Sequence, residues 1–385
     1  MPEADSSAAR YIRKLSHGVP GARTGALEEA TVEALGPERV EMALERAIAA
    51  IEKETGAPLD PASRAELERL FTDDGKRAID DLKRAGVNAR LDQRQEDALE
   101  AIVQQDGSRP TLPLSADDGF DVKDDTLGQW QASARQFEKQ IKAAASSVGR
   151  IDLDGRHIGT GFVVKPGIIL TNRHVLQDLA AVDAAGAWTF KGQPTITFDA
   201  NPAASRARQF TIHQRVVLAG RDHIDRLQLD VNRLDFAVLE CDVSGSGPFP
   251  TPLPLEGDAD KVVLKRPVFT IGYSAAPRHG AYSSEVLNRL FRHRYGVKRF
   301  SPGEIDRGIG TAAAGTGETV FAHDATTLGG NSGSCVVDFG NDGRLVVGLH
   351  FAGTPRTTNY AHANARLRAT LAELGFTWKD WIESE

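Results

Sequence analysis

Short apolar runs separated by glycine fill the chain from about Val148 onward, and this pattern constrains the fold more than any other feature. The runs include GRIDLDGRHIGTGFVV, GIILT, FAVLEC, PVFTIGY, SCVVDF and LVVGLHFAG. Apolar runs of this length, rich in Val, Ile and Phe and bounded by turn residues, indicate β-strands. Many strands at short spacing over roughly 200 to 250 residues predict a mostly β domain, a barrel or a sandwich, over residues 148–385.

The first 110 residues have the periodicity of helices instead. One apolar stripe at steps of three and four consists of Val40, Leu44, Ala47, Ile48 and Ile51. Such a stripe predicts a helix of about four turns with one buried face. Asp60-Pro61 has the form of an N-cap followed by proline at the first helical position, and a later helical stretch ends at Gly86. We therefore expect a small α-helical domain over residues 1–110, with a regulatory or interaction role.

Residues 111–147 differ in composition from both neighbours. Between Gln105 and Thr126 the chain is rich in Asp, Gly, Pro and Ser without sustained periodicity, as is typical of linkers. A stripe at helical spacing follows, made of Leu127, Trp130, Ala134, Phe137 and Ile141. We interpret residues 111–147 as a linker followed by one amphipathic helix that docks on the β domain.

Charge and composition exclude several function classes. The 385 residues contain 46 Lys and Arg against 53 Asp and Glu, a net charge of −7, so a basic surface for nucleic acid is not expected. No stretch has the roughly 18 consecutive apolar residues of a spanning helix, which predicts no membrane partner. The first twenty residues contain no apolar signal-peptide core, so we expect a cytoplasmic protein.

Cysteine and histidine usage predicts no metal and no cofactor. Cys241 and Cys335 are the two cysteines of the chain, too few for a disulfide framework and without zinc-site spacing. We expect both to be buried, reduced thiols. No HExxH sequence occurs, and the ten histidines do not cluster as metal ligands.

Three of the strand-rich segments carry the residue types that acyl transfer requires. The reaction needs a nucleophile, a base, a group that orients the base, and donors for the oxyanion. In chain order, His174 lies in GIILTNRHVL, Asp235 in LDFAVLE and Ser332 in GGNSGS. The glycines around Ser332 free the backbone to turn, so that the amides of Gly330 and Ser332 can form an oxyanion hole. His174 would be the base, with Asp235 as its orienting carboxylate.

This ordered set resembles the trypsin-like serine peptidases of the chymotrypsin fold, and within them the bacterial glutamyl-endopeptidase-like group. The resemblance covers about residues 148–385. It implies two antiparallel six-stranded β-barrels, the first with His174 and Asp235 and the second with Ser332. The spacings of 61 and 97 residues between these three positions suit that division. The implied activity is a serine endopeptidase that acts on a protein or peptide through an acyl-enzyme.

Local alternatives exist for the site residues. Asp230 competes with Asp235 as the orienting carboxylate, and we favour Asp235 because it directly precedes the FAVLE strand. Asn331 stands where members of the family that are activated by cleavage have an aspartate. We therefore interpret Arg150-Ile151 as the start of the first strand and not as an activation site. Taken alone, GNSG is also a common turn and a histidine after a strand is commonly structural.

The same resemblance bears on specificity. The aspartate at the base of the trypsin pocket is replaced by Thr326, so a Lys or Arg preference is not expected. Thr327 and His350 match the threonine and histidine with which glutamyl endopeptidases bind an acidic P1 residue. A hydroxyl beside an imidazole is a suitable carboxylate receptor. His350 could equally be a core histidine, in which case a small or apolar P1 residue is the alternative.

Two other function classes remain open. A peptidase-like barrel without turnover would be a binding or scaffold module, and an active one could be an esterase. The helical residues 1–110 could inhibit the peptidase, recruit a regulatory protein partner or promote oligomerisation. A helical region joined to such a domain without a signal peptide resembles cytoplasmic bacterial peptidases of regulatory or conflict systems.

Overall fold

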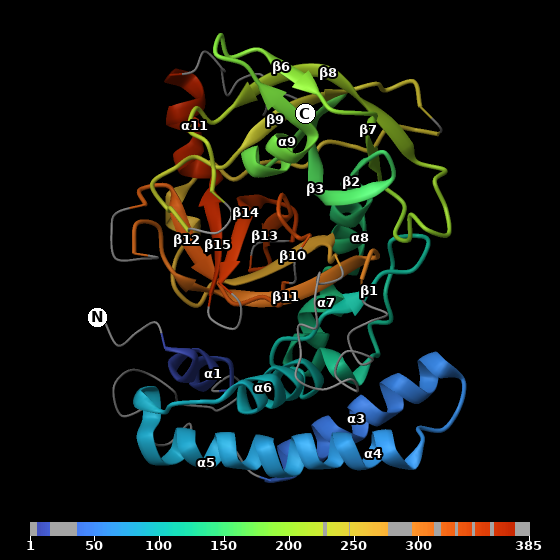
Figure 1. Ribbon diagram of the computed structural model, residues 1–385, viewed down its shortest axis with the longest axis vertical. Helices are drawn as coiled ribbons and strands as arrows, with labels where there is room; N and C mark the ends of the chain where they lie inside the picture. The colour runs from blue at the N-terminus through green and yellow to red at the C-terminus, as the bar shows by residue number, and fades with distance from the viewer. Residues whose placement is uncertain are drawn as a thin grey trace.

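A layer of helices lies against two stacked β-barrels (Figure 1). The computed structural model describes residues 6–15, 37–225, 229–245, 247–275, 295–311, 317–327, 330–340, 343–354 and 358–373. Within these residues no helix combines the length and the apolar character that crossing a bilayer would require. They also contain no group of three or more His, Cys, Asp or Glu residues placed to hold a metal ion.

The first barrel is closed by six antiparallel strands. They are β2 (Val148–Leu153), β3 (Arg156–Lys165), β4 (Ile168–Thr171), β7 (Pro194–Thr197), β8 (Gln209–Ala219) and β9 (Ala237–Cys241). Neighbours follow the order β2-β3-β4-β9-β8-β7, and β7 pairs with β2. Helix α9 (Arg173–Leu179) follows β4, and the hairpin β5 (Ala180–Val182) and β6 (Trp188–Phe190) follows the helix.

The second barrel is also closed by six antiparallel strands. They are β10 (Pro267–Tyr273), β11 (Lys298–Arg307), β12 (Val320–His323), β13 (Cys335–Asp338), β14 (Val346–Thr354) and β15 (Thr358–Ala363). The order is β11-β10-β13-β14-β15-β12, and β12 returns to pair with β11. The short turn η5 (Ala259–Lys261) precedes this barrel, and helix α11 (Asn364–Glu373) follows it. The prediction of two antiparallel six-stranded barrels is confirmed.

The helical region begins with α1 (Ser7–Leu15) and continues through α3 (Pro37–Thr55), α4 (Pro61–Glu68), the π-helix η2 (Arg69–Gly75), α5 (Lys76–Ala85), the 3-10 turn η3 (Gly86–Asn88) and α6 (Gln93–Gln105). The capping signals of the sequence are present. Asp60 accepts a hydrogen bond from the Ser63 amide at 2.9 Å, with Pro61 at the first helical position. Gly86 ends α5 with φ of 54°, which glycine adopts without steric cost.

The segment predicted to be a linker and one helix differs from that expectation. The 3-10 helix η4 (Asp125–Trp130) leads into two short helices, α7 (Gln131–Gln136) and α8 (Glu138–Ser146). They are separated at Phe137, where φ is −107° and ψ is 19°. The polar stretch 105–111 is buried throughout, and β1 (Leu112–Pro113) pairs with β11 of the second barrel. This segment is therefore part of the packed structure.

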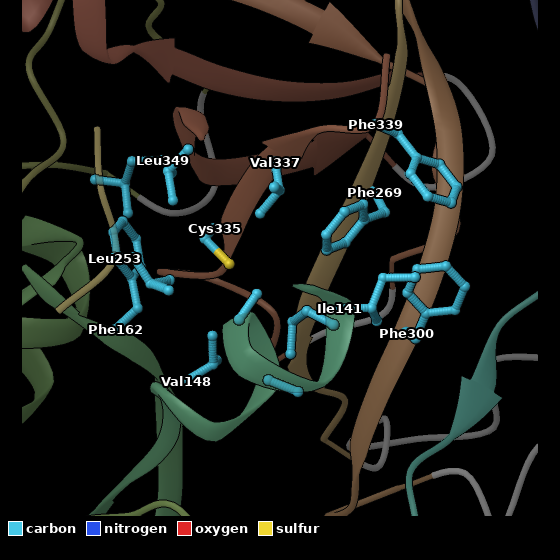
Figure 2. Packing of buried hydrophobic residues seen from close by; sticks show 14 of the residues in the cluster. Ile141, Val148, Phe162, Leu253, Phe269, Phe300, Cys335, Val337, Phe339 and Leu349 are labelled. Atoms are coloured by element: carbon cyan, nitrogen blue, oxygen red, sulfur yellow. The ribbon is translucent and has the colours of Figure 1, made fainter. Parts of the chain in front are cut away.

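The largest core joins this segment to both barrels, as Figure 2 shows. Ile141 of α8 lies close to Phe269 and Phe300 of the second barrel, and Val148 and Phe162 of the first barrel belong to the same cluster. Aromatic contacts extend the core, with the rings of Phe269 and Phe339 5.2 Å apart. Cys335 lies in the same cluster, and both cysteines are buried and free. Burial raises the pKa of the Cys335 thiol to about 12.

Candidate active site

His174 and Asp235 form a buried pair in the first barrel. His174 is the second residue of α9, and Asp235 lies two residues before β9. The backbone amide of His174 donates to Oδ1 of Asp235 at 2.9 Å, and Nδ1 of His174 lies 2.5 Å from Oδ2. The side-chain amide of Asn172 donates to the Asp235 carbonyl at 2.9 Å. The strand-to-helix turn therefore fixes the carboxylate and the imidazole together.

The electrostatics favour an ionised carboxylate beside an oriented imidazole. Burial, with Asp235 only 2% exposed, opposes its ionisation. The charge and the hydrogen bonds of His174 outweigh this effect and hold the pKa of Asp235 below its usual value. The competing carboxylate, Asp230, is half-exposed and pairs instead with Arg233 at 2.9 Å. Of the two candidates, the structure therefore brings Asp235 to His174.

A histidine that the sequence analysis missed contacts the same aspartate from the other barrel. His362 of β15 accepts a hydrogen bond at Nε2 from the backbone amide of Asp235, at 3.0 Å. Its Nδ1 lies 3.0 Å from the hydroxyl of Thr319, and its ring stacks on Phe351 with 4.3 Å between centroids. Since Nε2 accepts, the ring proton is on Nδ1. Burial lowers the pKa of His362 to about 4, so the imidazole is neutral at pH 7.

Ser332 lies on a turn that the second barrel presents to the first. Its carbonyl accepts a hydrogen bond from the amide of Thr160 in β3 at 2.8 Å. A Cβ added at Gly159 would lie 3.2 Å from that carbonyl and 2.7 Å from Cγ2 of Val175, the residue after His174. Only glycine leaves room for both neighbours. The Ser332 turn and the start of α9 therefore meet across Gly159.

Two glycines shape the turn around Ser332. Gly330 and Gly333 have φ of 92° and 91°, values that side-chain-bearing residues rarely adopt. A Cβ at Gly330 would lie 2.5 Å from the amide nitrogen of Ala275. The Gly330 carbonyl accepts a hydrogen bond from the Thr160 hydroxyl at 3.0 Å. Residues 328–329 lie outside the described residues, so the turn is described from Gly330 onward.

Asn331, between Gly330 and Ser332, has a partner of its own. Its side-chain amide donates to the Ser274 hydroxyl at 3.0 Å. Arg150 and Ile151 belong to strand β2, as expected from the sequence. The segment at which a cleavage would occur in activated relatives is therefore part of a paired strand.

Two of the predicted pocket residues, His350 and Thr327, have polar partners on β12 and β15. His350 of β14 is buried, and its Nδ1 lies 3.2 Å from Nε2 of His323 in β12. Burial, followed by the nearby His323, lowers the pKa of His350 well below its usual value. Thr327 donates to Oδ1 of Asn359 in β15 at 2.5 Å. His323 was not singled out from the sequence, because no local pattern relates it to His350.

Thr326 has a different environment from Thr327. Its hydroxyl is buried and donates to the backbone carbonyl of Arg109 at 2.8 Å. Arg109 comes from the end of the helical region, 217 residues earlier in the chain. The first of the two threonines therefore faces the helical layer.

These groups can perform nucleophilic acyl transfer. An imidazole oriented by an ionised carboxylate can take the proton of a neighbouring hydroxyl, and a glycine-shaped turn can offer amides to an oxyanion. None of these steps requires a group beyond the chain itself.

The chain is similar to one protein family and to several known proteins. Residues 159–349 match the family model described as a trypsin-like peptidase domain. A probable serine protease of Lysobacter enzymogenes is 29% identical over 333 residues, which is 81% of this chain and 83% of that protein. Among solved structures, an inactive mutant form of Rv3671c from M. tuberculosis H37Rv shares 20% identity, covering 63% of this chain and 93% of its own, with a TM-score of 0.38. A Glu endopeptidase shares 17% identity over 60% of this chain and 90% of its own, with a TM-score of 0.39.

Proposed function

Because the chain belongs to the trypsin-like serine peptidases, we propose that it is an active serine endopeptidase with Ser332, His174 and Asp235 as its catalytic triad. One observation carries the proposal. Both carboxylate oxygens of Asp235 are hydrogen-bonded by His174, on an element that meets the Ser332 turn. With Nδ1 held by a buried carboxylate, His174 keeps Nε2 as an acceptor, as a general base requires.

In the proposed reaction, Asp235 holds the proton of His174 on Nδ1, which leaves Nε2 free to accept. Nε2 takes the proton of the Ser332 hydroxyl while Oγ attacks the scissile carbonyl carbon. The amides of Gly330 and Ser332 stabilise the resulting oxyanion. The imidazolium then returns the proton to the leaving amine, and an acyl-enzyme forms. Water attacks the ester by the same proton transfers in reverse, which frees the product acid and Ser332.

We further propose an acidic P1 residue, bound by His350 and by the Thr327 hydroxyl, which would turn from Oδ1 of Asn359 to donate to the carboxylate. The lowered pKa of His350 implies that a neutral imidazole would bind the carboxylate through a donated N–H. If Nε2 of His323 donates to Nδ1 of His350, the proton of His350 is on Nε2 and can serve as that donor. Among the described residues, the buried Nδ1 of His323 has no hydrogen-bond partner. This supports the same tautomers, since a bare acceptor nitrogen costs less than a buried N–H without an acceptor.

The proposal includes a role for the helical region and a cellular setting. We propose that residues 1–110 control the peptidase and offer a surface to a regulatory protein partner. The contacts of Arg109 with Asp324 and Thr326, and of Arg13 with Asp306, support that role. A cytoplasmic location is proposed on the two buried cysteines, which form no disulfide.

Covalent labelling tests the central proposal. The full chain and its Ser332→Ala variant are incubated with a fluorophosphonate probe, followed by turnover of a peptide library that varies the P1 residue. We expect labelling of the wild type alone and preferred cleavage after Glu. No labelling of a folded wild type would favour a binding module. Labelling with ester but no peptide hydrolysis would favour an esterase, and no gain for Glu would remove the acidic P1 preference.

A further inference from the structure

Arg109, at the end of the helical region, contacts the substrate-pocket segment of the second barrel in two ways. Its guanidinium forms a bidentate pair with Asp324, with Nε 2.7 Å from Oδ1 and Nη2 2.5 Å from Oδ2. Its carbonyl accepts the hydrogen bond of the Thr326 hydroxyl at 2.8 Å. One residue of the helical layer therefore binds both Asp324 and Thr326 of the segment 324–327.

The arginine is itself held rigidly from several sides. Its side chain is fully buried, and its Nη1 donates to the Ser108 carbonyl at 2.5 Å. The guanidinium lies over the ring of Trp130, 5.6 Å from the centroid. The indole N–H of Trp130 donates to the same Ser108 carbonyl at 3.1 Å. A planar guanidinium fixed in this way sets the position of the carboxylate that it binds, and it also neutralises the charge of that carboxylate.

The segment that Arg109 holds is bounded by proposed pocket residues. It begins directly after His323, the partner of His350, and it ends at Thr327. Asp324 also accepts a hydrogen bond from the Glu304 amide at 2.8 Å, and the Ala325 carbonyl accepts one from Asn359 at 2.8 Å. A shift of Asp324 would therefore move the neighbouring residues on which the carboxylate receptor depends.

We infer that Arg109 is a positioning residue for the substrate pocket, and that the helical region supports the peptidase through it and does not inhibit it. The inference rests on the proposed peptidase function. Removing the guanidinium would leave the buried Asp324 carboxylate without its partner, which displaces the segment 324–327. His174 and Asp235 lie on the other barrel and keep their geometry.

The test compares variants of the full chain at two ion pairs of the same interface. Arg109→Lys keeps the charge but loses the fork, and Arg109→Gln loses both. Arg13→Gln is the matched control, because Arg13 pairs at 2.8 Å with Asp306, a residue of β11 outside the segment 324–327. The measurements are the kcat and KM for matched peptides with Glu and Ala at P1, the rate of fluorophosphonate labelling, and hydrogen exchange of the peptides that cover residues 320–327.

We expect both Arg109 variants to lose about tenfold or more in the Glu-to-Ala ratio of kcat/KM, mainly through KM, because the groups that bind the P1 carboxylate lose their position. Labelling stays near the wild-type rate, residues 320–327 exchange faster, and Arg13→Gln changes none of these. An unchanged ratio with unchanged exchange would overturn the inference. The wild type could neither label nor cleave while residues 320–327 still exchange faster in the Arg109 variants than in the wild type. That result would count against the proposed function alone.

A double variant covers the case in which the single variants do not fold. Arg109→Met with Asp324→Leu replaces the buried pair by apolar side chains of similar volume, a change that buried ion pairs commonly tolerate. We expect this variant to fold, to label and to lose P1 discrimination. Wild-type discrimination in the double variant would overturn the positioning role.

Discussion

His362 of the second barrel accepts a hydrogen bond from the backbone amide of Asp235 of the first barrel, 3.0 Å from nitrogen to nitrogen. The contact holds the backbone of Asp235, while His174 holds its carboxylate. His362→Phe keeps a ring but leaves that buried N–H unpaired, which costs about 1 to 3 kcal/mol of stability. We expect kcat to fall about tenfold as the carboxylate loses its position.

His362→Gln is the matched variant, because its amide oxygen can accept the same hydrogen bond. We expect Gln to restore most of kcat, as measured with one peptide substrate alongside the Phe variant. A Phe variant with full activity would mean that the hydrogen bond to Asp235 has no catalytic consequence.

Asp235→Asn tests the proposed orienting carboxylate. Asn preserves the shape but presents an N–H₂ group or a neutral oxygen to His174, which favours the wrong tautomer. In triads of this kind the change lowers kcat by about 10⁴, and we expect a loss of that order. Asp230→Asn is the control, since Asp230 pairs with Arg233 at the surface. Equal losses in both variants, measured as kcat, would refute the assignment.

Gly330→Ala tests the turn that carries the proposed oxyanion donors. The added Cβ would lie 2.5 Å from the Ala275 amide nitrogen, so the turn must shift, and the loss of one donor typically costs about 10² to 10³ in kcat. Gly310→Ala is the control, because Gly310 has a similar φ of 77° with no atom within 4 Å of the added Cβ. It should lose only about 1 to 2 kcal/mol of stability. Similar kcat values for the two variants would argue against the oxyanion role.

Buried histidines predict a loss of stability in mild acid. Burial lowers the pKa of His323 and of His362 from 6.5 to about 4. The unfolded chain therefore binds more protons than the folded one between these values. The contribution of each histidine to the free energy of unfolding is fully present above pH 6.5. It is lost as the pH falls towards 4, by about 1.4 kcal/mol per pH unit for each histidine.

Urea unfolding at a series of pH values measures this dependence. His323→Gln should reduce the slope of the free energy of unfolding against pH, between pH 6.5 and 4, by the contribution of one histidine, about 1.4 kcal/mol per pH unit. His213→Gln, at an exposed position, should not change it. A slope that is the same in wild type and His323→Gln would show that His323 does not titrate in this way.

The strands and the order of the candidate site residues could be predicted because their signals are local. Glycine-bounded apolar runs define the strands, and Asp235 was distinguishable from Asp230 by the strand that follows it. The caps at Asp60 and Gly86 were equally local, and the structure contains them. Such features depend on residues within a few positions of one another.

The contacts of Arg109, His323 and His362 could not be predicted, because each depends on a partner far away in the sequence. Arg109 and Asp324 are separated by 215 residues, and His362 and Asp235 by 127. The same holds for the stretch 105–126, whose composition favours a linker. Its composition is that of a loop, yet a Cβ at Gly107 would lie 2.7 Å from Cα of Gly128, and packing of this kind leaves no mark in composition.

The long separation of Arg109 from Asp324 also has a consequence in time. A ribosome adds about 5 to 20 residues per second, so the 215 residues between the two partners take roughly 10 to 40 s to make. During that interval the helices from α1 to α6 have been made, while the segment 324–327 has not yet been made. A nascent chain can therefore form the Arg109–Asp324 pair only when its last barrel closes on an arginine made long before.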